Sequence, residues 1–318
     1  MTAVQAPSHA GKQTRMAFGD ALLDAAATNQ RVVALSADTQ DLIPTRAFKE
    51  RFPERFVEVG IAEQNIIGVA AGLATAGLIP AACGYAPFLT ARSMEQVRND
   101  VAYANLHVVI AAAASGISLG VSGGTHHALE DIALMRSLPH MTVIVPADGD
   151  EAYAAGLAAL ELDGPVYVRL GGRLDEPAVS DPSRPFELGK AVELHPGNDV
   201  TLIACGSMVV QALQAARTLE GEGVGARVLN MHTIKPFDTQ AVLRAAAETR
   251  GIVTAEEHHL TGGLGGAVAE LLAVEHPTRM RMVGMPDTFA EVGPTGPLRA
   301  QYGMSADHIV AAARALLA

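Results

Sequence analysis

The sequence predicts an α/β fold of two domains, each with a mostly parallel sheet flanked by helices. Short β-branched runs alternate with helix-length segments, a pattern typical of strands joined by crossover helices. This alternation stops in a proline-rich stretch and then restarts. The chain has 318 residues, 49% hydrophobic and only 18% charged, which exceeds the usual size of one domain and excludes extensive disorder.

Residues 12–172 are predicted to form the first domain. A loose polar tail is expected over residues 1–11, which have no apolar core and so do not read as a secretory signal. The strands of this domain are expected at 31–35, 56–59, 79–82, 107–110, 141–145 and 165–169. Its helices are expected near 14–28, 63–76, 88–104, 128–137 and 149–161.

A linker is predicted over residues 173–190. Pro177, Pro182 and Pro185 stand there among charged residues, and neither helical nor strand periodicity is present.

The second domain is expected over residues 191–318. Its strands are predicted at 200–205, 226–230, 251–255 and 280–284, with helices near 207–221, 238–248 and 262–275. The last helix is expected to begin at Ser305, a favourable N-cap, and its apolar stripe comprises Ile309, Ala313 and Leu316.

Charge and composition exclude several classes of function. The net charge of −11 leaves no basic surface for nucleic acid or an anionic membrane. Residues 64–91 and 101–129 carry no charged side chain, but glycines break both, so we interpret them as buried core or subunit interface rather than membrane spans. Cys83 and Cys205 are too few for a disulfide scaffold or a cysteine metal site, which favours the cytoplasm.

Glu63 lies where a buried strand passes into a helix, at the carboxyl edge of the predicted parallel sheet. Ligands of open α/β folds usually bind at this edge. The alternative is that an acid in the first helical turn only complements the helix dipole.

A glycine-rich loop, residues 120–125, runs into His126 and His127. Glycine lets a backbone approach a ligand closely, so these histidines are candidate ligand-binding residues. His126 and Glu130 are four residues apart, and on one helical face they would form a metal site. No third ligand is evident, and helix capping by Glu130 and Asp131 explains these acids equally well.

Two further clusters follow predicted strands. Tyr85 and Phe88, three residues apart, could form a wall for a flat ring, or Phe88 could simply pack in the core. Arg169 and Arg173 suit a phosphate, although a solvated linker face would look the same. The glycine-rich stretch 261–267 lacks the spacing of a dinucleotide loop and is interpreted as close helix–strand packing.

Taken together, these segments resemble the transketolase family over nearly the whole chain. The order and spacing of five motifs carry the resemblance: Gly60-Ile-Ala-Glu-Gln-Asn65, Tyr85-Ala-Pro-Phe88, Gly124-Thr-His126, Leu134-Met-Arg-Ser-Leu-Pro139 and Val145-Pro-Ala-Asp148. More closely, the chain resembles the C-terminal subunit of a split transketolase, with a pyrimidine-binding domain and a transketolase C-terminal domain of the thiamin-diphosphate-binding fold.

The resemblance implies an enzyme that moves a two-carbon ketol unit from a ketose, phosphorylated or not, to an aldehyde with thiamin diphosphate as cofactor. The Gly-Asp-Gly motif of the family's diphosphate-binding domain does not occur in this sequence. The resemblance therefore implies a diphosphate-binding N-terminal partner subunit that holds the Mg or Ca ion, in a 2+2 heterotetramer with the site between subunits. No metal site is expected in this chain itself.

The resemblance also implies roles for individual residues. Glu63 matches the glutamate that bonds the aminopyrimidine N1′, because a carboxyl group there stabilises the tautomer that deprotonates the thiazolium C2. Phe88 matches the aromatic residue that stacks on the pyrimidine, with Tyr85 at another aromatic position. Asp38 matches an acid near the thiazolium, and His126 matches a histidine that bonds substrate oxygens. Arg169 or Arg173 falls where the family holds a sugar phosphate.

Four positions depart from the family pattern. Ser122, Ala114 and Ala91 replace an aspartate, a histidine and a tyrosine, and His127 replaces a glutamine and is interpreted as supplying a lost hydrogen bond to substrate. The departures at Ser122, Ala114 and Ala91 motivate one alternative, an accessory subunit whose catalytic site has decayed. The nearest enzyme alternative is the β subunit of a 2-oxo-acid dehydrogenase, which shares the two-domain plan.

Overall fold

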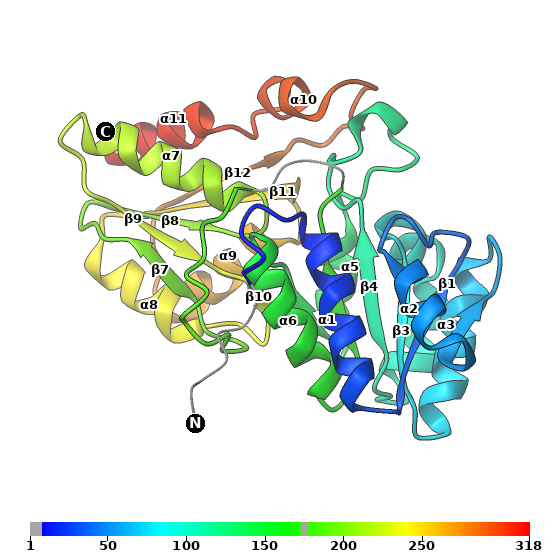
Figure 1. Cartoon of the computed structure of the whole chain (residues 1–318). Coiled ribbons are helices and arrows are strands. Elements are labelled where there is room, and N and C mark those ends of the chain that lie inside the picture. Colours follow the sequence, from blue (N-terminus) through cyan, green and yellow to red (C-terminus); the bar gives the residue numbers. More distant parts are fainter. Residues whose placement is uncertain (1–7, 173–176) are drawn as a thin grey trace.

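The computed structural model describes residues 8–172 and 177–318 as two α/β sandwiches that lie side by side. One contains a seven-stranded sheet in the order β10-β5-β6-β4-β3-β1-β2, and the other a five-stranded sheet in the order β12-β11-β8-β9-β7. Figure 1 shows helices on both faces of each sheet. The predicted two-domain α/β class with mostly parallel sheets is therefore confirmed.

The seven-stranded sheet is parallel except at one edge, where β10 pairs antiparallel with β5. Its strands are β1 (Val32–Ser36), β2 (Phe56–Glu58), β3 (Ile79–Tyr85), β4 (Val109–Ala113), β5 (Thr142–Ile144), β6 (Val166–Arg169) and β10 (Thr233–Lys235). Its helices are α1 (Thr14–Thr28), α2 (Thr45–Arg51), η1 (Pro53–Arg55), α3 (Glu63–Thr75), η2 (Phe88–Arg92), α4 (Met94–Gln96), η3 (Val97–Ala102), η4 (Gly120–Ser122), α5 (Asp131–Ser137) and α6 (Gly149–Glu161).

The five-stranded sheet is parallel except for its edge strand β7. Its strands are β7 (Val192–His195), β8 (Val200–Ala204), β9 (Ala226–Asn230), β11 (Ile252–His259) and β12 (Met280–Met285). Its helices are α7 (Met208–Glu220), α8 (Thr239–Glu248), α9 (Leu264–Glu275), α10 (Thr295–Gln301) and α11 (Ala306–Leu317).

Alternate side chains of the first sheet enter two different apolar cores. Val32 and Ala34 of β1 pack with α1 and α6, whereas Val33 and Leu35 pack with α3 and α5. Both faces are thus covered, as the continuous apolar strands require. The second of these cores continues into α8, α9 and β8 of the other sandwich, so the two halves share buried apolar surface.

All ten predicted strands are present, as are the predicted helices except in one region. The helix expected over 88–104 is broken into π-helical segments η2 and η3 around the short α4. The strands β7 and β10 and the helices α2 and α10 were not expected. α11 begins one residue after Ser305 as predicted, but the Ser305 hydroxyl pairs with His308 Nδ1 at 2.7 Å rather than capping the backbone.

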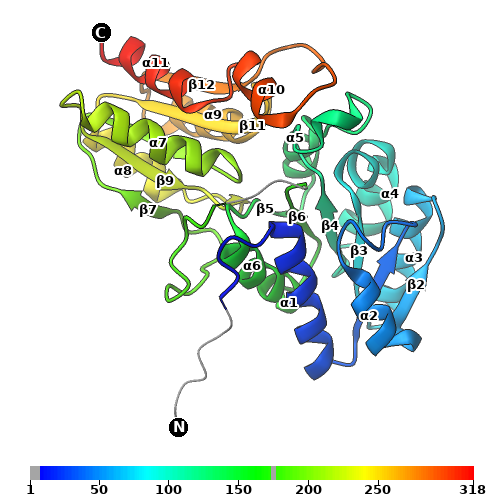
Figure 2. The same cartoon turned by 45° about the horizontal axis from the view of Figure 1, so that its top comes forward.

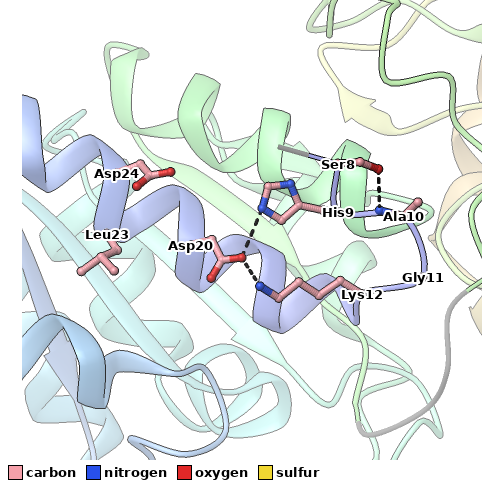
Figure 3. Close-up of a pocket in the computed structure, with 8 residues that line it drawn as sticks. All are labelled: Ser8, His9, Ala10, Gly11, Lys12, Asp20, Leu23 and Asp24. Carbon is pink, nitrogen blue, oxygen red and sulfur yellow. Dashed lines mark hydrogen bonds and ion pairs between the residues drawn. The ribbon is translucent and has the colours of Figure 1, made fainter. Parts of the chain in front are cut away.

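The expectation of a loose tail over 1–11 does not hold for its last residues. His9 is only 6% exposed, its ring stacks on Tyr153 of α6, and its backbone N–H donates to Asp150. Figure 3 shows His9 and Lys12 both directed at Asp20 of α1, with His9 Nε2 3.2 Å from Asp20 Oδ2. Residues 8–12 are therefore fastened between α1 and α6, whereas residues 1–7 lie outside the described chain.

The described part of the predicted linker, 177–190, contains neither helix nor strand. It is tied back to the first sandwich, because Asp148, the N-cap of α6, accepts hydrogen bonds from Val179 N and Ser180 N at 2.7 Å each. In residues 8–172 and 177–318, no helix has both the length and the apolarity needed for a membrane span.

Candidate active site

The candidate site lies at the carboxyl edge of the seven-stranded sheet. β1, β3 and β4 are adjacent and parallel, so the segments that follow them leave the sheet at the same edge. These segments contain Asp38, the Tyr85–Phe88 turn and the loop from Gly116 to Ala128. The topology thus places three of the predicted clusters along one edge.

Glu63 is the first residue of α3 and is only 4% exposed. Its carboxylate sits at the positive end of the helix dipole, which favours the charge. Oε2 also pairs with Arg92 Nη1 at 2.7 Å. Arg92 is 46% exposed. Its guanidinium therefore lies between solvent and the buried carboxylate of Glu63.

Phe88 begins the π-helical turn η2, which ends at Arg92. The wide π turn brings residues four apart nearly into register, and the Arg92 guanidinium lies 4.1 Å from the centre of the Phe88 ring. A single planar cation therefore contacts both the aromatic face of Phe88 and the carboxylate of Glu63.

The Phe88 ring also meets the rings of Tyr85 and His126. Tyr85 and Phe88 have ring centres 5.8 Å apart, and His126 lies 5.7 Å from Tyr85 and 5.2 Å from Phe88, all in edge-on orientation. The Thr125 hydroxyl pairs with His126 Nδ1 at 3.1 Å, which leaves Nε2 for another partner. The structure thus connects four predicted residues: Arg92 joins Glu63 to Phe88, and the Phe88 ring meets those of Tyr85 and His126.

The remaining residues of the glycine-rich loop have contrasting environments. Ser122 is exposed at the loop tip, whereas His127 is only 6% exposed. Neither ring nitrogen of His127 has a hydrogen-bond partner among the described residues. Burial lowers the pKa of His127, and the Glu257 carboxylate acts in the opposite direction. His127 is therefore a neutral imidazole near pH 7.

The metal-site alternative required His126 and Glu130 to lie on one helical face. α5 begins only at Asp131, so the two residues do not share a helical face. Glu130 Oε1 instead lies 3.5 Å from His259 Nε2. Across 8–172 and 177–318, no group of three or more histidine, cysteine or acidic side chains is arranged to hold a metal ion.

Asp38 is exposed just beyond β1 and adopts a left-handed backbone with φ of 57°. Its N–H donates to Glu58 Oε1 at 2.8 Å, which ties the ends of β1 and β2 together. Burial raises the pKa of Glu58, but hydrogen bonds from Asp38, Gln40 and Gly60 outweigh burial and leave it below its usual range.

Arg169, expected as one of two candidate ligands of a substrate anion, instead forms a buried ion pair with Asp131. It is 5% exposed on β6, and its Nε and Nη2 atoms pair with Asp131 Oδ2 and Oδ1 at 2.6 and 3.1 Å. Nη2 also donates to the carbonyls of Ala128 and Glu257. β6 is a central strand, so its last side chain points into protein rather than solvent. Arg173 lies outside the described residues.

The Asp131–Arg169 pair is fully enclosed, and Tyr167 donates a further 2.6 Å hydrogen bond to Asp131. Burial raises the pKa of Asp131, but the Arg169 charge and hydrogen bonds bring it below its usual value. Two buried charges that satisfy each other in this way form a rigid support beneath the loop.

Two of the four departures from the family pattern are also placed. Ala114 is fully buried directly after β4, with φ of 59°, and Ala91 is exposed within η2. The glycine-rich stretch at α9 packs closely, because a Cβ on Gly265 would lie 2.9 Å from Thr254 Oγ1. The N-terminus of α9 is already occupied by Glu256, which accepts from Leu264 N and Gly265 N.

Sequence reasoning assigned no role to Arg92, although it ends the segment that contains Tyr85 and Phe88. It also missed Glu257, which anchors the start of the Gly116–Ala128 loop from β11. The only signal for Arg92 was its spacing of four from Phe88, and no local pattern links Glu257 to residues 140 positions earlier.

Comparison with known proteins gives matches over both halves of the chain. Residues 10–174 match the transketolase pyrimidine-binding domain, and residues 189–309 match the transketolase C-terminal domain. The chain is 46% identical to the 6-deoxy-6-sulfo-D-fructose transketolase subunit SqwH of Clostridium sp. (strain MSTE9), over 94% of this chain and 92% of the relative. It is 39% identical to an apulose-4-phosphate transketolase subunit of Phocaeicola vulgatus, over 93% of this chain and 94% of the relative.

The solved structure of a split-gene transketolase, described as an inactive β4 tetramer, superposes with a TM-score of 0.90. It is 45% identical in sequence, and the match covers 96% of this chain and 98% of that chain.

Proposed function

This chain belongs to the transketolase family, and on that premise we propose that it is the C-terminal subunit of a split, thiamin-diphosphate-dependent transketolase. The complete enzyme would transfer a two-carbon ketol unit from a ketose to an aldehyde. Residues 12–172 would act as the pyrimidine-binding domain and residues 191–318 as the C-terminal domain, joined by the linker over 173–190.

The contact of Arg92 with both Glu63 and Phe88 carries this proposal. The guanidinium is planar, donates hydrogen bonds from its N–H groups and stacks on aromatic faces. It lies between the buried carboxylate of Glu63 and the ring of Phe88. An aminopyrimidine that is protonated at N1′ has the same three properties. The residues present therefore fit the pyrimidine half of the coenzyme.

When bound, thiamin diphosphate supplies a thiazolium that stabilises the carbanion formed by C–C cleavage. Glu63 would hold a proton at the pyrimidine N1′, and Phe88 would stack on that ring with Tyr85 beside it. His126, through its free Nε2, and Ser122 and His127 would bind sugar hydroxyls. Asp38 would lie near the thiazolium.

The remainder of the coenzyme requires a second chain. This sequence has no Gly-Asp-Gly, so the Mg or Ca ion and the diphosphate would be held by an N-terminal transketolase subunit. Two apolar side chains beside the site, Ile61 and Val121, are 76% and 68% exposed, which suits a surface covered by another protein. We propose a 2+2 heterotetramer in the cytoplasm.

The substrate class follows from the names of the relatives. One is named for a sulfonated ketose and the other for a ketose phosphate, so both relatives act on sugars that carry an anionic group. We propose an anionic ketose donor for this enzyme as well, with carbohydrate metabolism as its setting. Because Arg169 is committed to Asp131, Arg173 remains the proposed ligand for that anion.

Reconstitution tests the proposal. The chain would be co-expressed with a diphosphate-binding chain from a neighbouring reading frame, one that contains Gly-Asp-Gly and a downstream Asn. The purified pair would be assayed with thiamin diphosphate, Mg²⁺ and ribose 5-phosphate, against fructose 6-phosphate, 6-deoxy-6-sulfofructose, apulose 4-phosphate and pyruvate. We expect transfer from at least one ketose and none from pyruvate.

Two outcomes would overturn the assignment. Decarboxylation of pyruvate without ketol transfer would indicate the β subunit of a 2-oxo-acid dehydrogenase. A stable pair that binds no thiamin diphosphate would indicate a decayed accessory subunit.

A further inference from the structure

The loop from Gly116 to Ala128 connects β4 to the segment before α5 and carries Ser122 and His126. Its base is closed by two backbone bonds, Gly116 N to Ala128 O at 2.8 Å and Ala128 N to Gly116 O at 3.0 Å. This bridge fixes where the loop starts and ends, but it leaves the tilt of the loop to other contacts. In the first half of the chain, Tyr85 and Phe88 contact the ring of His126 and Arg169 bonds Ala128 O, whereas the contacts to Ile117 and Gly120 described next come from the second half.

Glu257, near the end of β11, provides the first contact. Its carboxylate is 3% exposed, and Oε1 accepts a 2.8 Å hydrogen bond from Ile117 N. Gly116 has φ of 61°, and a Cβ on it would lie 2.6 Å from the Glu257 carboxyl carbon. The loop backbone therefore rests directly on this carboxylate, which only a glycine at position 116 permits.

The other oxygen of Glu257 is held from two further elements. Arg299 Nη2 of α10 and the Ser207 hydroxyl, just before α7, each lie 2.6 Å from Oε2. Burial raises the pKa of Glu257, but the Arg299 charge and these hydrogen bonds bring it below its usual range. The carboxylate is therefore ionised near pH 7 and joins the loop to α10.

The segment before and at the start of α10 makes two more contacts with the loop. The Thr295 hydroxyl donates to Ile117 O at 2.9 Å, and Gly293 N donates to Gly120 O at 3.2 Å. Figure 2 shows α10 beside this loop. Both polar backbone groups of Ile117 are thus bound by the second half of the chain, while the tip residues Ser122 and His126 have no such attachment to the described residues of that half.

We propose that the Glu257–Arg299 ion pair, together with Thr295, positions the Gly116–Ala128 loop so that His126 meets the sugar. Glu257 and Thr295 contact the loop backbone, and Arg299 holds the Glu257 carboxylate, so all three are positioning residues that act through His126. This proposal rests on the proposed function. Displacements of about 1 Å in such a loop cost on the order of a hundredfold in rate, so a clamp at Ile117 controls catalysis from outside the site.

Three variants of the full chain test the clamp. Glu257→Gln keeps the acceptor for Ile117 N but removes the charge that Arg299 binds. Thr295→Val is nearly isosteric and removes one hydrogen bond, so it is expected to fold even if Glu257→Gln does not. Glu248→Gln is the control for losing an arginine-bound carboxylate away from the loop: Glu248 lies 2.6 Å from Arg227, which is about as buried as Arg299, while Glu248 itself is 52% exposed.

Hydrogen exchange of the isolated chain gives the first readout. We expect amides of residues 117–126 to exchange about tenfold faster in Glu257→Gln and severalfold faster in Thr295→Val, while Glu248→Gln leaves them unchanged. Because this readout needs neither partner nor coenzyme, unchanged loop exchange in both clamp variants would overturn the clamp even if the proposed function holds.

Kinetics of the reconstituted pair give the second readout. We expect the KM for the ketose to rise about fivefold or more in the clamp variants, with thiamin diphosphate Kd within twofold of wild type. Losses of ketose binding, coenzyme binding and thermal stability in the same proportion would mean a merely structural role and would overturn the proposal. If no ketose is turned over by wild type, the proposed function fails while the exchange result still decides the clamp.

Discussion

Arg92 donates a 2.7 Å hydrogen bond from Nη1 to Glu63 Oε2 and covers the ring of Phe88 with the same guanidinium. The Arg92 side chain thereby occupies the two groups that the coenzyme's pyrimidine would contact, the Glu63 carboxylate and the Phe88 ring. Coenzyme binding would then require Arg92 to leave both partners.

We expect Arg92→Ala to strengthen thiamin diphosphate binding by the reconstituted pair, because the competing guanidinium is gone. A half-exposed ion pair and one cation–π contact are together worth about 1 kcal/mol, so Kd should fall roughly three- to tenfold. Equilibrium dialysis measures this. Arg98→Ala, which removes an exposed arginine bonded to Asn99, is the control. Weaker binding in Arg92→Ala would mean that Arg92 assists the coenzyme instead.

Asp131→Asn should destabilise the chain far more than its charge change suggests. It leaves the guanidinium of Arg169 buried without its counter-charge, at a cost of about 3–5 kcal/mol. Urea unfolding should show this loss, whereas Asp41→Asn, which breaks the exposed pair with Arg46, should cost less than about 1 kcal/mol. Equal effects of the two substitutions would contradict a fully buried Asp131–Arg169 pair.

Glu151 of α6 makes stability depend on pH. Burial raises its pKa to about 7, even though Ala147 N and Asn230 Nδ2 donate to the carboxyl group. Between the ordinary value near 4.5 and pH 7 the folded chain holds a proton that the unfolded chain has lost, so this group makes stability fall as pH rises, and the effect levels off above 7.

Glu151→Gln removes this titration. The free energy of unfolding of Glu151→Gln minus that of wild type should therefore rise by roughly 1–2 kcal/mol from pH 6 to pH 8, with most of the rise below pH 7. Urea unfolding of both proteins across this range measures the difference. Burial lowers the pKa of His232 to about 4, so His232 makes stability rise with pH, opposite to Glu151. Because both proteins contain His232, most of its contribution cancels in the difference. A difference independent of pH would contradict the raised pKa.

Short β-branched runs that alternate with helix-length segments predicted the layered architecture, because the strands of a sheet covered on both faces are continuous apolar runs. They missed β10, since three residues, Thr233–Lys235, carry too little pattern and pair with a strand ninety positions earlier. They also read 88–104 as one helix, because the π turn at Phe88–Arg92 has the same composition as an α-helix.

Motif order singled out Glu63, Tyr85, Phe88 and His126 as candidate site residues, and the fold gathers them at one sheet edge. Arg169 was misjudged because its partner Asp131 is distant in sequence, and an arginine after a strand looks the same whether it faces solvent or a buried carboxylate. The supports of the loop, Glu257 and Arg299, come from another sheet and another helix, and only tertiary structure shows their contact with the loop.

Zinc should be absent from the purified chain in stoichiometric amount. His126 pairs with Thr125 and Glu130 lies beside His259, so the proposed pair of ligands is not assembled in the described structure. Elemental analysis after dialysis without chelator checks this, and one zinc per chain would restore the metalloenzyme hypothesis.

Proton transfer through Glu63 is the central claim, and deuterium exchange at C2 of thiamin diphosphate bound to the reconstituted complex tests it most directly. We predict that Glu63→Gln lowers both this exchange and ketol transfer by about a hundredfold or more, while the subunits still assemble and the coenzyme stays bound. Exchange near the wild-type rate in Glu63→Gln, with coenzyme demonstrably bound, would contradict the assigned role.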